Sequence, residues 1–299
     1  MAKESWVTEF PDMERSDLIA LRKTLDGAYR EFSREHGDLI ESFFDPLLAF
    51  LVWFENLLIG APWLLILAVI IGLAYAASRS WKLCLGVVGA LLTIGYFGMW
   101  ENTMRTLSVI TVCTLLSLVL GIPVGIAMAR SDRVRKLVTP MLDIMQTMPA
   151  FVYLIPVVML LGIGKIPGVI AVVIYAIPPV IRLTNLGIRL VDKEVLEAAT
   201  AYGASPWQRL WGVQLPLAMP TIMAGINQTI MMALAMVVIA SMIGVKGLGQ
   251  PVLKSITNQY FTLGLLNGLA IVALAIIFDR VSQAYARRTQ KHSGGAGHA

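Results

Sequence analysis

Residues 193–217 read KEVLEAATAYGASPWQRLWGVQLPL and form a polar interruption between two long apolar runs, at 167–186 and 220–243. Apolar side chains in the first part of this segment recur at helical spacing: Val195, Leu196, Ala199 and Tyr202. Gly203 follows them, and a glycine after the last periodic residue commonly ends a helix. The segment predicts a short helix that ends in a glycine turn and lies in water between two membrane spans.

The rest of the chain is far more apolar than a soluble domain. Of its 299 residues 57% are hydrophobic and 14% are charged, and the mean hydropathy is +0.73, whereas soluble domains carry about 25% charged residues. A helix needs about 20 apolar residues to cross the hydrocarbon layer. We therefore predict an all-α integral membrane protein in which residues 61–284 form one transmembrane domain. Its approximately seven helices lie at 62–77, 82–100, 104–128, 137–163, 167–186, 220–243 and 262–278.

Arginine and lysine gather in alternate loops. One set of loops carries most of them: Arg79, Lys82, Arg130, Arg133, Arg135, Lys136, Arg189, Lys193, Arg209, Arg280, Arg287, Arg288 and Lys291. The other short loops carry only Arg105, Lys165, Lys246 and Lys254. Because positively charged loops remain in the cytoplasm, we expect the 193–217 segment and the C-terminus inside and the N-terminus outside. The same rule accounts for the net charge of +5 without nucleic-acid binding.

The two ends of the chain are more polar than its middle. Residues 1–43 are predicted to form a separate polar region, with helical spacing of apolar side chains from Leu18 to Phe32. Residues 44–60 are apolar on one side but contain Glu55, which favours an amphipathic helix lying in the membrane interface. The alternative is an eighth span, which would place the N-terminus in the cytoplasm. Residues 285–299 are predicted to be a disordered cytoplasmic tail.

The sequence offers no residue pattern typical of catalysis, a metal site or nucleotide binding. Its three histidines are far apart, and Cys84 and Cys113 fall within predicted spans. The glycine-rich stretches 162–165 and 247–250 lack the spacing of a phosphate-binding loop and are interpreted as turns. We therefore expect neither an enzyme nor a metal or cofactor on this chain. Transport against a concentration gradient would then need a separate subunit that hydrolyses ATP.

The segment 188–217 resembles the EAA loop of permease subunits of bacterial ABC importers. The residues that carry this resemblance are Glu197, Ala198, Ala199, Gly203, Val213, Leu215 and Pro216. Across about residues 100–260 the chain is also similar to the permeases of glycine betaine, proline betaine and choline importers. The matching stretches are QTMPAF (146–151), YAIPP (175–179), RLTN (182–185), PLAMPT (216–221), GINQT (225–229) and IGVKGLG (243–249).

This resemblance implies a type I ABC importer permease fold in a bacterial cytoplasmic (inner) membrane, with a cytoplasmic EAA coupling helix. Two copies of the permease would form the pathway, two cytoplasmic ATPase subunits would hold ATP and Mg²⁺, and an extracytoplasmic binding protein would deliver a quaternary ammonium compound such as glycine betaine, choline or proline betaine. Uptake of such compounds serves osmoprotection or nutrition, and the residues do not distinguish these roles.

Polar residues within spans are the candidates for the translocation pathway, because each must face protein or water rather than lipid. They are Gln146, Thr147, Asn185, Asn227, Gln228 and Thr229. Three aromatic side chains offer ring faces to a quaternary ammonium: Phe151, Tyr153 and Tyr175. Packing between helices is the other interpretation of each aromatic residue.

Two other classes of membrane protein remain alternatives at this stage. An ion-gradient-driven secondary transporter of a small zwitterion would call for membrane-embedded carboxylates and often an inverted repeat, and neither is visible. A membrane enzyme would need catalytic groups at one depth, and no histidine lies in a predicted span. Neither alternative accounts for the EAA-like segment.

Overall fold

The computed structural model describes residues 12–294, with side chains described as far as residue 288. These residues are mostly helical and contain no strand. The elements are α2 (Arg15–Gly60), α3 (Trp63–Ser78), α4 (Trp81–Tyr96), α5 (Trp100–Arg130), α6 (Asp132–Thr147), α7 (Ala150–Leu161), α8 (Lys165–Ala176), α9 (Pro178–Arg189), α10 (Lys193–Ala201), α11 (Pro206–Arg209), the π-helical turn η1 (Leu210–Gln214), α12 (Leu215–Ala240), the 3-10 turn η2 (Ser241–Ile243), α13 (Gly249–Asn258) and α14 (Phe261–Gly294).

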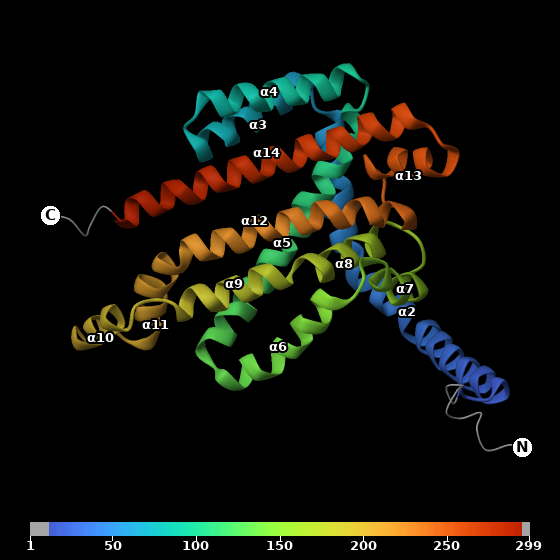
Figure 1. Ribbon diagram of the computed structural model, residues 1–299, viewed down its shortest axis with the longest axis horizontal. Coiled ribbons are helices and arrows are strands. Elements are labelled where there is room, and N and C mark those ends of the chain that lie inside the picture. Colours follow the sequence, from blue (N-terminus) through green and yellow to red (C-terminus); the bar gives the residue numbers. More distant parts are fainter. Residues whose placement is uncertain (1–11, 295–299) are drawn as a thin grey trace, which may run out of the picture.

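Helices α5, α9 and α12 form the tightly packed centre of the bundle, and α14 lies along the other side of α12 (Figure 1). Glycines on α5 permit the close approach of α9. A Cβ atom added at Gly121 would lie 2.5 Å from Cγ1 of Val180, and one at Gly125 would lie 2.8 Å from the carbonyl oxygen of Ile181. Small residues at helix contacts are typical of membrane proteins, where close van der Waals packing holds helices together.

Each of the seven predicted apolar runs is helical over at least part of its length. The helices differ in whether they are long and apolar enough to cross a membrane. By length and hydropathy, five segments of residues 12–294 could span: α2, α5, Lys165–Arg189, Pro206–Ile243 and Phe261–Arg288. Helices α3 and α4, predicted as two spans, have only 16 residues each. At 1.5 Å per residue each is about 24 Å long, which is shorter than the hydrocarbon layer.

The predicted run 137–163 is not one straight helix. Helices α6 and α7 together are apolar enough for one span, but they meet at an angle of 101°. The break falls at Met148, whose backbone is extended with φ −69° and ψ 133°, directly before Pro149. A proline disfavours the helical conformation of the preceding residue, so this residue pair explains the bend.

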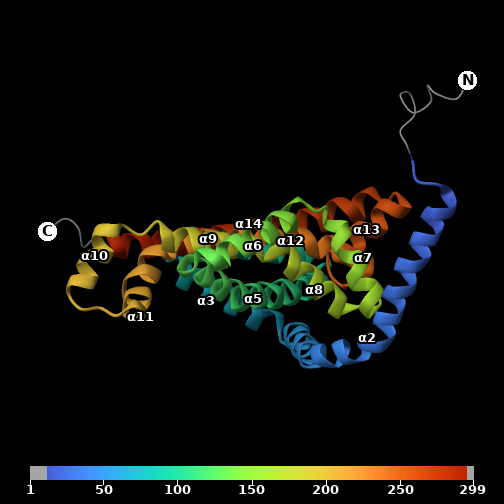
Figure 2. The same cartoon turned by 90° about the horizontal axis from the view of Figure 1, so that it is seen from below.

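Helix α2 runs without a break across the boundary predicted at residues 43 and 44, with Pro46 inside it. In Figures 1 and 2 it crosses α12 and α14 at a steep angle instead of running beside them. Its length and hydropathy fit a span, but this direction favours the interfacial helix. At the other end of the chain, α14 continues to Gly294. Residues 285–294, predicted as part of a disordered tail, are therefore helical, while 295–299 lie outside the described residues.

A buried carboxylate fastens α2 to the bundle. The side chain of Glu55 is 5% exposed and forms ion pairs with Arg105 of α5 at 3.1 Å and with Lys165 of α8 at 2.7 Å. Arg105 also pairs with the exposed carboxylate of Glu101. Glu55, the polar residue that interrupts the apolar run 44–60, thus pairs with two of the four cations expected at the outer end of the bundle.

Replacing Glu55 by Gln is expected to destabilise the protein by about 3 kcal/mol, because two partly buried cations would lose their shared counter-ion. Thermal unfolding of the purified protein in detergent measures this effect. Glu101→Gln is the matched control, because the Glu101 side chain is 60% exposed, and loss of an exposed pair costs about 1 kcal/mol or less. Equal unfolding temperatures for Glu55→Gln and the unmodified protein would contradict the anchoring role.

Candidate functional site

The helix predicted within residues 193–217 is present as α10, Lys193–Ala201. The carboxylate of Asp192 accepts a hydrogen bond of 2.9 Å from the backbone N–H of Glu194 and so caps its first turn. Gly203 follows with φ +81°, a left-handed conformation that glycine adopts at little cost. The chain then reverses direction into α11.

Helix α10 protrudes from one end of the bundle (Figures 1 and 2). None of its nine residues is buried. Glu197 and Ala198 are exposed, and Tyr202 beyond the helix is 93% exposed. An isolated helix this short is marginal in water, and α10 packs mainly beside α11 and η1. Its exposed residues are therefore free to contact another protein.

The segment after α10 holds this helix in place. Ser205 and Gln208 form a capping box at the start of α11. The guanidinium of Arg209 donates a hydrogen bond of 2.8 Å to the hydroxyl of Thr200 on α10. The rings of Trp207 and Trp211 lie 5.8 Å apart in an edge-to-face arrangement. The Arg209–Thr200 hydrogen bond joins α10 and α11 into one hairpin, so that a displacement of α10 would also displace α11.

The hairpin joins the centre of the bundle through η1. Val213 is half-buried in this π-helical turn, and Pro216 is exposed at the start of α12. Leu215 is buried together with Ile188 of α9. The predicted coupling residues therefore divide into an exposed contact surface on α10, a glycine turn and a buried anchor between α9 and α12. Leu215 forms the anchor.

The residues predicted for the pathway are not gathered at one place. Gln146, Thr147 and Phe151 are exposed around the bend between α6 and α7. Tyr153 and Tyr175 lie behind the bend in the bundle core, with ring centroids 5.9 Å apart at an interplanar angle of 74°. The hydroxyl of Tyr153 donates to the carbonyl of Met145. These five residues lie in one region of the bundle. Gln146, Thr147 and Phe151 form its exposed rim, and the two tyrosines pack beneath them.

The other predicted pathway residues point in different directions. Asn227, Gln228 and Thr229 are consecutive on α12, so their side chains are about 100° apart around the helix. Asn227 faces α14, Gln228 is exposed and Thr229 is completely buried. Asn185 accepts a hydrogen bond of 3.1 Å from Nε of Arg189, one turn later on α9. Of the three predicted pathway residues on α12, Gln228 alone is exposed.

A polar cluster between α12 and α14 was not predicted. Oδ1 of Asp279 accepts hydrogen bonds from the Asn227 amide at 2.9 Å and from the Gln283 amide at 2.7 Å. Ser282 completes the cluster by donating to Oδ1 of Asn227. The available sequence signal was the spacing of Asp279, Ser282 and Gln283 on one helical face, but the predicted span ended at residue 278, which placed Asp279 outside it.

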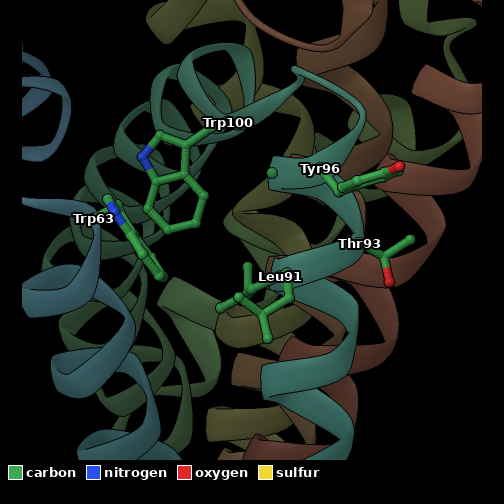
Figure 3. A pocket seen from close by; sticks show the side chains of 7 residues that line it. Trp63, Leu91, Thr93, Tyr96 and Trp100 are labelled. Atoms are coloured by element: carbon green, nitrogen blue, oxygen red, sulfur yellow. The ribbon is translucent and has the colours of Figure 1, made fainter.

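One hollow in the described part of the chain does not coincide with the predicted pathway. It has a volume of about 730 Å³ and is lined from α3, α4 and the start of α5, mostly by apolar side chains. In Figure 3, Trp63 and Trp100 face it from one side, while Tyr96 and Thr93 point away. The aromatic rings do not converge as a cage for a cation would require. We interpret this hollow as a gap on the apolar flank of the bundle.

Comparison with known proteins places this geometry in a family. Residues 121–291, which include α10 and the buried anchor, match the model for the binding-protein-dependent transport system inner membrane component. The chain is 48% identical to the glycine betaine/carnitine transport permease protein GbuB of Listeria monocytogenes serotype 1/2a (strain 10403S) over 77% of this chain and 82% of that relative. It is 41% identical to the glycine betaine transport system permease protein OpuAB of Bacillus subtilis (strain 168) over 91% and 96%.

A solved structure shares the fold at much lower sequence identity. The inward-facing MetNI methionine ABC transporter superposes with a TM-score of 0.57 and 20% identity, covering 62% of this chain and 93% of the matched chain. The sequence matches and the shared fold are consistent with a helical bundle that carries an exposed helix at one end. The chain belongs to the family of inner-membrane components of binding-protein-dependent transport systems, and it is a membrane permease subunit of an ABC transporter.

Proposed function

We propose that this permease imports a quaternary ammonium compound such as glycine betaine, and that α10 docks on a separate ATPase subunit. The observation that carries the docking proposal is a capped helix with no buried residue that protrudes from the bundle. Its sequence also has the Glu-Ala-Ala and glycine pattern of a coupling loop. The names of GbuB and OpuAB support the solute class. An ion-driven secondary transporter, the alternative drawn from the sequence, is disfavoured by the family match.

The contacts define a route for movement from the ATPase to the bundle. ATP-driven closure of two ATPase subunits would displace α10, and the Arg209–Thr200 hydrogen bond would carry α11 with it. The motion would then pass through η1 to Leu215 and reach the tightly packed contact between α9 and α12. Because the packing leaves little free space, α9 and α12 would move together. In this proposal, two copies of the chain form the pathway and an extracytoplasmic binding protein delivers the solute.

The arrangement of the described residues also supports a membrane orientation. Helix α10 and the C-terminal part of α14 lie at the same end of the bundle, whereas α13 and the first turns of α2 lie at the other (Figures 1 and 2). The first end carries the arginine-rich loops, and at the other Glu55 and Glu101 balance Arg105 and Lys165. By the positive-inside rule, we place α10 in the cytoplasm and the start of α2 outside.

The exposed rim at the bend between α6 and α7 is our candidate for solute contact. Phe151 is 53% exposed there and offers the accessible ring, because Tyr153 is only 5% exposed. Attraction between a quaternary ammonium and a ring face is worth ~0.5–2 kcal/mol. Gln146 and Thr147 on the same rim supply groups that can hydrogen-bond to a carboxylate or hydroxyl. This neighbourhood matches both ends of a molecule such as glycine betaine.

Replacing Gly203 by Val is expected to uncouple transport from ATP hydrolysis. Its φ of +81° costs a residue with a β-branched side chain roughly 1–3 kcal/mol, so the turn after α10 would change shape. Solute uptake and ATPase activity are measured in the same membrane vesicles. Gly86→Val in α4, away from the coupling route, is the control, because an added Cβ there meets no atom within 4 Å and φ is not positive. Normal coupling in Gly203→Val would contradict the proposed role of the turn.

Replacing Glu197 by Lys is expected to weaken the complex with the ATPase, because the reversed charge lies on the exposed contact surface. A like-charge contact in an interface costs several kcal/mol, which corresponds to a loss of affinity of roughly a hundredfold or more. Co-purification of the ATPase with the tagged permease measures the loss. Glu194→Lys makes the same charge change one turn earlier and is expected to retain more ATPase. Undiminished co-purification with Glu197→Lys would count against docking through α10.

A further inference from the structure

A second hollow lies between the turn that joins α3 to α4 and the C-terminal part of α14, at the same end of the bundle as α10. It has a volume of about 500 Å³, which is in the size range of ligand sites. Four arginines line it, together with small hydroxyl side chains: Arg79, Arg280, Arg287, Arg288, Ser78 and Ser80. No acidic side chain is among its lining residues.

The positive-inside rule accounts for arginines at this end, but not for their convergence on one hollow. Arg280 and Arg287 are seven residues apart on α14 and therefore share a helical face, with Gln283 between them. Arg79 comes from the opposite wall, where the turn gives it a φ of +51°. Among residues 12–288, the ion pairs found do not include Arg79, Arg280 or Arg287. Their charges remain available to an anion.

One hydrogen bond joins the two walls of the hollow. The guanidinium of Arg288 donates a hydrogen bond of 2.9 Å to the carbonyl of Ala76 at the end of α3. The guanidinium of Arg79 lies 5.8 Å from the centroid of the Tyr75 ring. The start of α4 also borders the hollow, and its first N–H groups add partial positive charge. The site is therefore a shaped recess between three helices.

The hairpin of α3 and α4, which lines the recess, also carries exposed apolar side chains. Leu73, Trp81 and Leu85 on α3 and α4 are 66%, 67% and 63% exposed. Behind them, the hairpin of α3 and α4 packs on α14 through a cluster that includes Cys84 and Ile277. A hairpin that carries both an anion-binding recess and this exposed apolar wall suits an amphiphile with an anionic head. Trp81 is also of the residue type that favours the boundary between hydrocarbon and water.

We propose that this recess binds the phosphate headgroup of an anionic phospholipid, whose acyl chains lie against α3 and α4. Guanidinium groups form paired hydrogen bonds with phosphate oxygens, and basic pockets between membrane helices bind anionic headgroups. Free inorganic phosphate has the same charged chemistry, but it would make no use of the apolar wall. A bound lipid would join the short α3–α4 hairpin to α14 in addition to the Arg288 contact.

Native mass spectrometry of the purified full-length chain tests this proposal. Phosphatidylglycerol, phosphatidylethanolamine or inorganic phosphate is added at equal concentrations to the protein in a neutral detergent. We expect retention of one tightly bound phosphatidylglycerol, weaker binding of phosphatidylethanolamine and no displacement by phosphate. In Arg280→Gln/Arg287→Gln, the affinity for phosphatidylglycerol should fall by roughly 30-fold, since each arginine near a headgroup contributes about fivefold.

Arg133→Gln/Lys136→Gln is the matched control, because it removes two exposed cations at the same end of the bundle without touching the recess. Its affinity should change little. Arg280→Lys/Arg287→Lys should recover part of the binding, and the unfolding temperatures of all variants in lipid-free detergent should agree. Equal losses in both Gln double variants would overturn the proposal in favour of a diffuse charge effect. Displacement of the lipid by inorganic phosphate at the same concentration would overturn the assignment to a lipid.

Discussion

The close contact of α5, α9 and α12 is the constraint on which the rest of the molecule depends. At Gly121 and Gly125 the backbones approach so closely that a side chain larger than hydrogen would collide with α9. Helices packed in this way cannot slide independently, because any gap would forfeit contacts that lipid does not replace. Helix α10 is connected to this packed centre through Leu215, which is buried in one cluster with Ile188 of α9. A small exposed helix can therefore act on the whole centre of the bundle.

The charged residues divide the molecule into two ends with different tasks. At the end away from α10, the buried Glu55 pairs with Arg105 and Lys165 and joins three helices. Together with Glu101 it balances the charge of these two cations. At the α10 end, several arginines converge on a recess or lie on exposed loops, and their charge is available to other molecules. The same residue type thus contributes to structure at one end and to contacts with a partner or with lipid at the other.

Much of this organisation could be predicted from the sequence, and the features that could not be predicted have physical causes. The helix at 193–201 follows from the spacing of Val195 and Leu196 and from the glycine at 203. Residues 137–163 were predicted as one span from their apolar length, which does not reveal how sharply the chain bends where Pro149 restricts Met148. The continuity of α2 was missed because Pro46 and Asp45 suggested a boundary. Contacts between distant residues, such as Asn227 with Asp279, depend on packing that a single sequence does not encode locally.

Site-directed cross-linking tests the central claim, that α10 is the docking surface for an ATPase. Cys84 and Cys113 are buried, so a cysteine introduced at the exposed Ala198 would be the main reactive thiol. The chain is expressed with its neighbouring transport subunits in native membranes and treated with a short bifunctional reagent. The account predicts a cross-link from Ala198→Cys to a subunit that contains a nucleotide-binding loop, and none from Gln250→Cys at the opposite end. Failure of Ala198→Cys to cross-link, or an equal yield from Gln250→Cys, would contradict it.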